Sequence, residues 1–287
     1  KNNSLEQIEL YPYAQLTRKN IPEDLKGFYI LHEGFIAVLD EELKEDDYDD
    51  IEEKKIVRVA DKGWIGITDK YWMTALIPES GEKFKSTFLY QDAYKANFLL
   101  NNPKIIAPKT KASNEIKIFV AAKEVQTIDA YAEQENIEKL DLIIDWGWFY
   151  FFTKPLFFAV DYLFKLTGNF GIAIVLITIM IRLIFFPLAS YSFKSMAKMK
   201  ALQPEMARLK DLHKDDKVKL QQAIMALYKK EQINPASGCL PVLIQIPFFF
   251  AIYKMLFISL EMRHQPFFGW IKDLSASDPT TIFNLFG

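Results

Sequence analysis

Cysteine is almost absent from this chain, since Cys239 is the only one among 287 residues. A single cysteine excludes an intrachain disulfide. The three histidines, His32, His213 and His264, lie far apart in the sequence and match no metal-ligand spacing. We therefore expect neither a metal site nor a disulfide framework.

Motifs of nucleotide-driven and hydrolytic enzymes are also missing. The sequence contains no glycine-rich phosphate loop, no Gly-x-Ser-x-Gly elbow and no His-Glu-x-x-His helix. These absences predict a protein that is not an enzyme and that needs no cofactor.

Charge and hydropathy divide the chain into two unlike halves, although its net charge is only −2 and its mean hydropathy is close to zero. Residues 1–140 contain 26 acidic and 19 basic residues, whereas residues 141–287 contain 11 acidic and 16 basic residues. Every long apolar run lies in the second half. The division predicts a soluble acidic domain joined to a basic membrane domain.

The first half is typical of an all-β fold. Short apolar and β-branched runs separated by Gly, Asp and Pro predict a β-sandwich over residues 1–140, followed by a helix over 122–140. The acid-rich stretch 40–53 is expected to be a solvated loop or edge, with a metal or partner site as the alternative. The expected strands cover residues 28–31, 35–39, 55–59, 64–68, 71–77, 84–90 and 115–120.

Residues 141–169 are crowded with aromatic side chains. Lys154, Asp161 and Lys165 are spaced by seven and four residues, so a helix would carry them on one face. This pattern predicts an amphipathic helix lying in the membrane interface. A buried helix of the soluble domain is the alternative.

Two apolar stretches are long enough to cross a bilayer, at residues 170–189 and 239–260. Residues 261–287 mix aromatic and charged residues and then become apolar again, which predicts a periplasmic interfacial loop and the start of a further span. The chain begins at Lys1 without an apolar export segment, so we also expect an N-terminal anchor and later spans to lie outside it.

The segment between the two stretches, residues 190–238, carries ten basic and five acidic residues. A basic connection between spans predicts a cytoplasmic location. Apolar stripes on either side of Asp216, a candidate N-cap, predict a helical hairpin. Its charges either only fix the topology or also form a docking surface, for which the candidates are Lys194, Lys198, Lys200, Arg208, Lys210 and Lys217.

Arg182 lies inside the first apolar stretch, where a charge costs about 2.5–3.5 kcal/mol on insertion scales. Thr178 lies four residues earlier and therefore shares its helical face. One interpretation is an arginine that extends to the cytoplasmic headgroups. The other is an arginine that faces a water-filled recess and offers its fixed charge to a passing polar segment.

Several motifs in residues 145–287 together resemble one known family. The segments 182–188, 195–199, 202–204, 226–229 and 234–235, with Pro241, Gln245, Pro247 and Asp273, occur in its order and spacing. They resemble the bacterial YidC branch of the YidC/Oxa membrane protein insertases. Residues 10–13 and 31–34 are similar to the periplasmic domain of that branch.

The resemblance implies a helical membrane core of five spans around a hydrophilic groove, of which this chain would hold two complete spans, together with an outer β-sandwich. It implies an insertase and chaperone in the bacterial inner membrane, acting alone or with the Sec translocon. A non-inserting chaperone or assembly scaffold is the alternative. Implied partners are nascent membrane proteins, lipids and the ribosome or signal recognition machinery, with no nucleic acid substrate. Implied groove and substrate-binding residues are Thr178, Arg182, Phe186, Pro241, Ile246, Pro247 and Phe249.

Overall fold

The computed structural model describes residues 1–22, 25, 30–214, 216–231, 234–238 and 240–276. The chain forms two compact units. The first comprises Lys1–Trp148 and Leu256–Glu261, and the second comprises Phe149–Met255 and Met262–Gly287.

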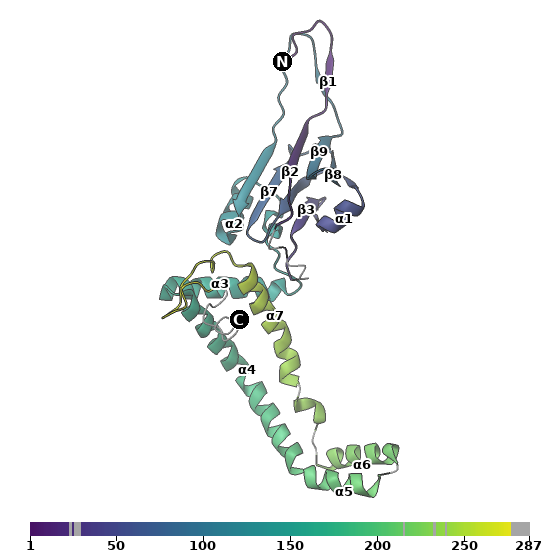
Figure 1. Cartoon of the computed structure of the whole chain (residues 1–287), viewed down its shortest axis with the longest axis vertical. Coiled ribbons are helices and arrows are strands. Elements are labelled where there is room, and N and C mark those ends of the chain that lie inside the picture. The colour runs from purple at the N-terminus through teal and green to yellow at the C-terminus, as the bar shows by residue number, and fades with distance from the viewer. Residues whose placement is uncertain (23–24, 26–29, 215, 232–233, 239, 277–287) are drawn as a thin grey trace. The chain divides into compact units, whose positions relative to one another are not determined.

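The first unit is built on two antiparallel sheets, shown in Figure 1. The five-stranded sheet has the order β11 (Lys117–Ala122), β7 (Trp72–Ile77), β6 (Gly63–Thr68), β3 (Gly34–Leu39) and β4 (Glu42–Asp46). The four-stranded sheet has the order β2 (Tyr13–Arg18), β9 (Tyr94–Leu100), β8 (Phe84–Tyr90) and β5 (Ile56–Ala60). A separate ribbon pairs β1 (Ile8–Leu10) with β10 (Lys104–Ile106).

The core of this unit lies between the two sheets, because alternate residues of each strand point inward. Phe35 of β3 and Phe88 of β8 are fully buried, and their ring centroids are 4.9 Å apart. Phe84 and Phe98 form an edge-to-face pair within the four-stranded sheet. The predicted β-sandwich is therefore confirmed.

Short helices cover parts of the sandwich. The acid-rich stretch 40–53 contributes the edge strand β4 and helix α1 (Tyr48–Glu53), which buries Tyr48 and Ile51 in the core. Helix α2 (Val125–Gln134) packs on β11 through the rings of Phe119 and Tyr131, whose centroids are 5.9 Å apart. The helix expected over 122–140 thus ends at Gln134, and a 3-10 turn, η1 (Leu140–Ile143), follows.

Six of the seven expected strands are present, as β3, β5, β6, β7, β8 and β11. Of the strand expected over 28–31, residues 28 and 29 lie outside the described part of the chain, and Ile30 and Leu31 lie in a turn and a bend. Strands β1, β2, β9 and β10 were not predicted, and β4 lies at the edge of its sheet in the stretch expected to be a loop or edge. In β2, Gln15 and Thr17 are exposed, so that strand has the alternating pattern of a half-buried strand without a long apolar run.

The second unit is helical. It contains α3 (Tyr150–Thr167), α4 (Phe170–Ala201), α5 (Gln203–Leu212), α6 (Lys217–Lys230), the 3-10 turn η2 (Pro235–Gly238) and most of α7 (Leu240–Ile258). Asn169 caps α4 by accepting a hydrogen bond from the Ile172 amide at 3.1 Å. Pro187 lies inside α4 without ending it, so the helix continues to Ala201, beyond the stretch 170–189 expected to cross the membrane.

Helices α4 and α7 are long and apolar enough to span a membrane. Only 11% and 22% of their most apolar segments are buried. A core helix of a soluble protein would be mostly buried, so the two helices have the surface of lipid-facing segments. The second expected span, 239–260, corresponds to α7, whereas the further span expected near the C-terminus lies outside the described residues.

Helices α5 and α6 form the predicted hairpin, and Figure 1 shows them side by side. The Tyr228 hydroxyl of α6 contacts the Met206 sulfur of α5 at 3.5 Å. Asp216 caps α6 by accepting from the Lys219 amide at 2.9 Å, which confirms the predicted N-cap. All six candidate docking residues are exposed, namely Lys194, Lys198, Lys200, Arg208, Lys210 and Lys217.

Candidate functional site

The aromatic ring of Phe248 joins three helices of the second unit. It lies 4.3 Å from the ring of Phe152 on α3 and 4.9 Å from the ring of Phe185 on α4, measured between centroids. Aromatic contacts of this kind contribute about 0.5–1.5 kcal/mol beyond their buried area. They fix the face that α7 presents to α4, and the candidate site lies on that face.

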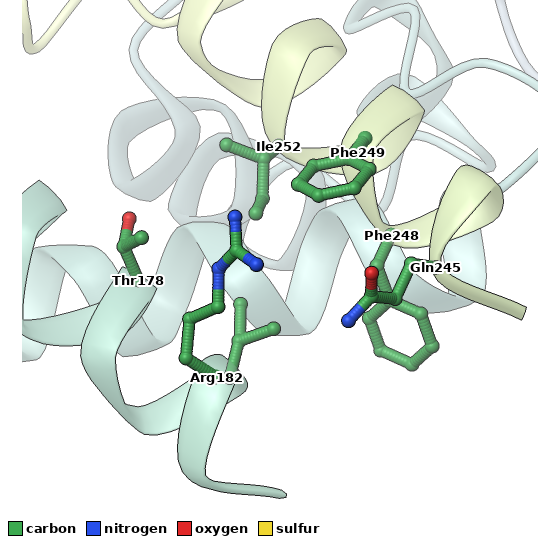
Figure 2. A pocket seen from close by; sticks show the side chains of 7 residues that line it. Thr178, Arg182, Gln245, Phe248, Phe249 and Ile252 are labelled. Atoms are coloured by element: carbon green, nitrogen blue, oxygen red, sulfur yellow. The ribbon is translucent and has the colours of Figure 1, made fainter. Parts of the chain in front are cut away.

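A small recess lies between α4 and α7 (Figure 2). Its volume is about 20 Å³, which is room for about one water molecule. Its lining is apolar apart from three polar side chains. The complete lining consists of Thr178, Ile181, Arg182, Gln245, Phe248, Phe249 and Ile252.

Arg182 supplies the charge of the recess. Its guanidinium carbon lies 5.9 Å from the centroid of the Phe249 ring, at the outer limit of a cation–π contact. Among the described residues it has no hydrogen bond or ion pair, and its side chain is exposed. The guanidinium therefore keeps its five donors available to a ligand.

Two neutral polar groups accompany the arginine. The Thr178 hydroxyl donates to the Ile174 carbonyl at 2.7 Å, which leaves its oxygen free to accept. The Gln245 side chain comes from α7 and is half-buried, and in Figure 2 its amide points toward the space beside the guanidinium. The recess can therefore both donate and accept hydrogen bonds within an otherwise apolar surface.

The depth of Arg182 follows from helix geometry. Twelve residues separate it from Phe170, where α4 begins, and this corresponds to about 18 Å of rise. The hydrocarbon core of a bilayer is about 30 Å thick. If α4 enters the membrane at Phe170, Arg182 lies past the midplane, where a polar recess or water must offset the cost of its charge.

Three of the predicted groove residues line the recess: Thr178, Arg182 and Phe249. Pro241, Ile246 and Pro247 lie on α7 and Phe186 lies on α4, but none of these four is part of the lining. Their roles remain predictions. Gln245 and Phe248 were not among the predicted site residues, although a glutamine in an apolar helix is a signal that singles out the former.

Two family models match the chain. Residues 1–159 match the model described as the YidC periplasmic domain. Residues 162–286 match the model described as the 60Kd inner membrane protein. The boundary between the two matches falls within α3, so the sandwich and the apolar helices belong to separate modules.

Curated proteins from several bacteria are similar over the whole chain. A membrane protein insertase YidC from Pelagibacter ubique is 58% identical over 286 residues, covering 100% of this chain and 51% of that protein. Proteins with the same name from Brucella melitensis and Rickettsia africae are 49% and 50% identical over 293 residues, covering 100% of this chain and 48% and 52% of theirs. The chain thus spans about half the length of these relatives.

Proposed function

We propose, because this chain belongs to the YidC family, that its two apolar helices form part of a membrane protein insertase. The whole protein inserts inner-membrane proteins and helps them to fold. The observation that carries this proposal is the recess at Arg182, which combines a fixed positive charge with Thr178 and Gln245 on an otherwise lipid-facing pair of helices.

The protein is an inner-membrane protein with a periplasmic domain. The proposed topology puts the sandwich and residues 261–276 outside and the segment 190–238 inside, since basic connections remain cytoplasmic. The proposed domain arrangement follows: sandwich with trailing helix over 1–140, interfacial helix over 141–169, spans over 170–189 and 239–260, and the hairpin between them.

The proposed mechanism uses no nucleotide hydrolysis. A short hydrophilic end of the substrate enters the groove, where Arg182 and Thr178 replace part of its lost hydration. The apolar part of the substrate moves along α4 and α7 into lipid, because transfer out of water favours it. The membrane potential assists the outward movement of acidic residues.

The proposed groove and partners extend this mechanism. Phe186, Pro241, Ile246, Pro247 and Phe249 contact the apolar part of the substrate. The six exposed basic residues of the cytoplasmic segment dock the ribosome, the signal recognition machinery or lipid headgroups, since they offer positive charge without burial. Nascent membrane proteins are the substrates, and the Sec translocon is a partner for larger ones.

Reconstitution tests the proposal. The full-length protein is placed in liposomes with a small single-span substrate that has a short acidic tail, and protection of the tail from protease is measured. We expect protection severalfold above that in protein-free liposomes. Substrate that binds the proteoliposomes but stays fully accessible to protease would instead identify a non-inserting chaperone.

A further inference from the structure

Residues 262–276 fold back on themselves as a closed loop within the second unit. The Leu274 amide donates to the Gln265 carbonyl at 2.9 Å, and the Phe267 amide donates to the Ile271 carbonyl at 3.0 Å. These two bonds bring both ends of the loop together. Its turn, residues 268–270, is consequently held at a defined position.

The Asp273 carboxylate joins the two ends of the loop by hydrogen bonds. Its Oδ1 accepts from the His264 amide at 3.1 Å and from the Ser275 hydroxyl at 2.6 Å, and its Oδ2 lies 2.8 Å from Nδ1 of His264. The hydrogen bonds from Ser275, followed by those from His264, hold the pKa of Asp273 well below its ordinary value. The carboxylate therefore stays ionised and keeps its partners at any physiological pH.

The loop is attached to the first turn of α4. The Asn169 side-chain amide donates to the Phe267 carbonyl at 3.3 Å. A Cβ atom on Gly171 would lie 2.2 Å from the Phe267 ring, so this approach requires glycine. The loop is thus fixed at the level where the apolar helix α4 begins.

The turn of the loop is apolar and exposed. Phe268 is 59% exposed and Trp270 is 66% exposed, and Gly269 between them has φ of +61°, a conformation that glycine adopts without strain. The turn is flanked in the sequence by three exposed basic residues of the same loop, Arg263, His264 and Lys272. Aromatic rings beside basic residues are the composition that favours the membrane–water interface.

We propose that Phe268 and Trp270 insert into the outer leaflet at the boundary of headgroups and acyl chains, while Lys272 faces the lipid phosphates. The partner is the lipid surface rather than another protein, because the loop contacts the first turn of a membrane-spanning helix and must share its level. The apolar faces of interfacial helices are buried to about 5–10 Å, and we expect the two rings to reach a similar depth.

This anchor has a consequence for the groove. Since the loop is bound to Asn169 and Gly171, it fixes the height at which α4 enters the membrane. Arg182, about 18 Å further along the helix, is then held at a constant depth. The anchoring itself does not depend on the proposed insertase function, and its test measures depth rather than insertion.

Depth-dependent quenching provides the test. The full-length protein, with Cys239 and any further cysteine replaced by serine, carries an environment-sensitive fluorophore on a cysteine introduced as Phe268→Cys. The vesicles contain equal parts phosphatidylethanolamine and phosphatidylglycerol. We expect quenching by lipids with a nitroxide near the headgroup to exceed quenching by aqueous iodide severalfold. A matched control, Leu5→Cys in the first unit, should show the reverse, since Leu5 is 84% exposed and lies outside both apolar helices.

Two results at position 268 would overturn the proposal. Quenching by iodide as strong as at position 5 would mean that the turn lies in water, and quenching by neither reagent would mean that protein covers it. The loop closure is tested separately with Asp273→Ala, which should remove most of the nitroxide quenching while the sandwich keeps its protease resistance. Unchanged quenching in that variant would refute the role of Asp273.

Discussion

Arg182 is the only charged residue between Phe170 and Phe193, and its position in an apolar helix needs a physical reason. The recess provides one, because Thr178 and Gln245 lie beside the guanidinium and Phe249 covers one side of it. An arginine that only extended to the headgroups would need no polar residue from α7. The groove interpretation is therefore the one that uses every polar group of the recess.

Substitution of Arg182 should separate charge from hydrogen-bond geometry. We expect Arg182→Ala to slow insertion of an acidic-tailed substrate by about tenfold, equivalent to about 1.4 kcal/mol of lost stabilisation. Arg182→Lys should retain much of the rate, because the positive charge remains. The measurement is the initial rate of tail protection in proteoliposomes. Wild-type rates in Arg182→Ala would contradict the role of the charge.

Asp46 and Arg58 form a bidentate ion pair in the first unit, with N–O distances of 2.6 and 2.7 Å. The Asp46 side chain is only 8% exposed and that of Arg58 is 26% exposed. We expect Asp46→Ala to destabilise the sandwich by about 2–3 kcal/mol, below the ~3–5 kcal/mol typical of fully buried pairs. Denaturant unfolding measures the change.

A control for this prediction is Glu42→Ala, which removes the exposed pair of Glu42 with Lys44. Exposed pairs contribute about 0–1 kcal/mol, so this variant should unfold nearly like the wild type. Equal destabilisation by the two substitutions would show that burial of the Asp46–Arg58 pair is irrelevant.

Among the elements, α2 receives an unusual cap. Its own N-cap residue, Glu124, makes no side-chain capping bond, and the Glu261 carboxylate instead accepts from the Val125 amide at 3.1 Å. Ser259 donates to the same carboxylate at 3.1 Å. Burial raises the pKa of Glu261 above its ordinary value of 4.5, despite these hydrogen bonds.

The raised pKa has a defined effect on stability. The folded state binds the Glu261 proton more tightly than the unfolded state, so this residue lowers stability as the pH rises from about its ordinary pKa through its raised one. We expect Glu261→Gln to remove that component, so that the melting temperature of the variant gains on that of the wild type as the pH rises from about 4.5 and the gain levels off above the raised pKa. A pH-independent difference between the two melting curves would contradict the assignment.

Elements were predictable from the sequence where their apolar residues were continuous. Strands β3 and β6 and helices α4 and α7 each contain an uninterrupted apolar run, and all four were expected. Strands such as β9, with Lys95 and Asn97 on one face, give a weaker signal. The length of α4 was underestimated because Pro187 removes only one amide donor, to which the helix adjusts.

The candidate site was only partly predictable because it depends on contacts between distant segments. Thr178 and Arg182 share a helical face, and their spacing of four residues identifies them. Gln245 lies beside Thr178 and Arg182 because the Phe248 ring packs against Phe152 of α3 and Phe185 of α4. No local sequence pattern predicts these contacts. The packing of Gly171 against Phe267 is unpredictable for the same reason.

At the scale of the whole molecule, two modules with different surfaces lie in one chain. The sandwich buries Phe35, Phe84, Phe88 and Phe98 in its core, whereas the apolar segments of α4 and α7 are mostly exposed. Each module matches its own family model, and together they cover about half the length of the curated relatives. The central claim for this molecule is that the Arg182 face of α4 meets water while a neighbouring exposed face meets lipid.

Cysteine reactivity across α4 tests that claim most directly. Single cysteines are introduced into protein whose Cys239 and any further cysteine are replaced by serine, and membrane vesicles are exposed to a water-soluble maleimide from the cytoplasmic side. Thr178→Cys lies on the Arg182 face. Ile179→Cys, at nearly the same depth, lies about 100° around the helix and is 50% exposed on the surface expected to meet lipid. We predict rapid labelling at position 178 and little at position 179. Equal protection of both cysteines would contradict it.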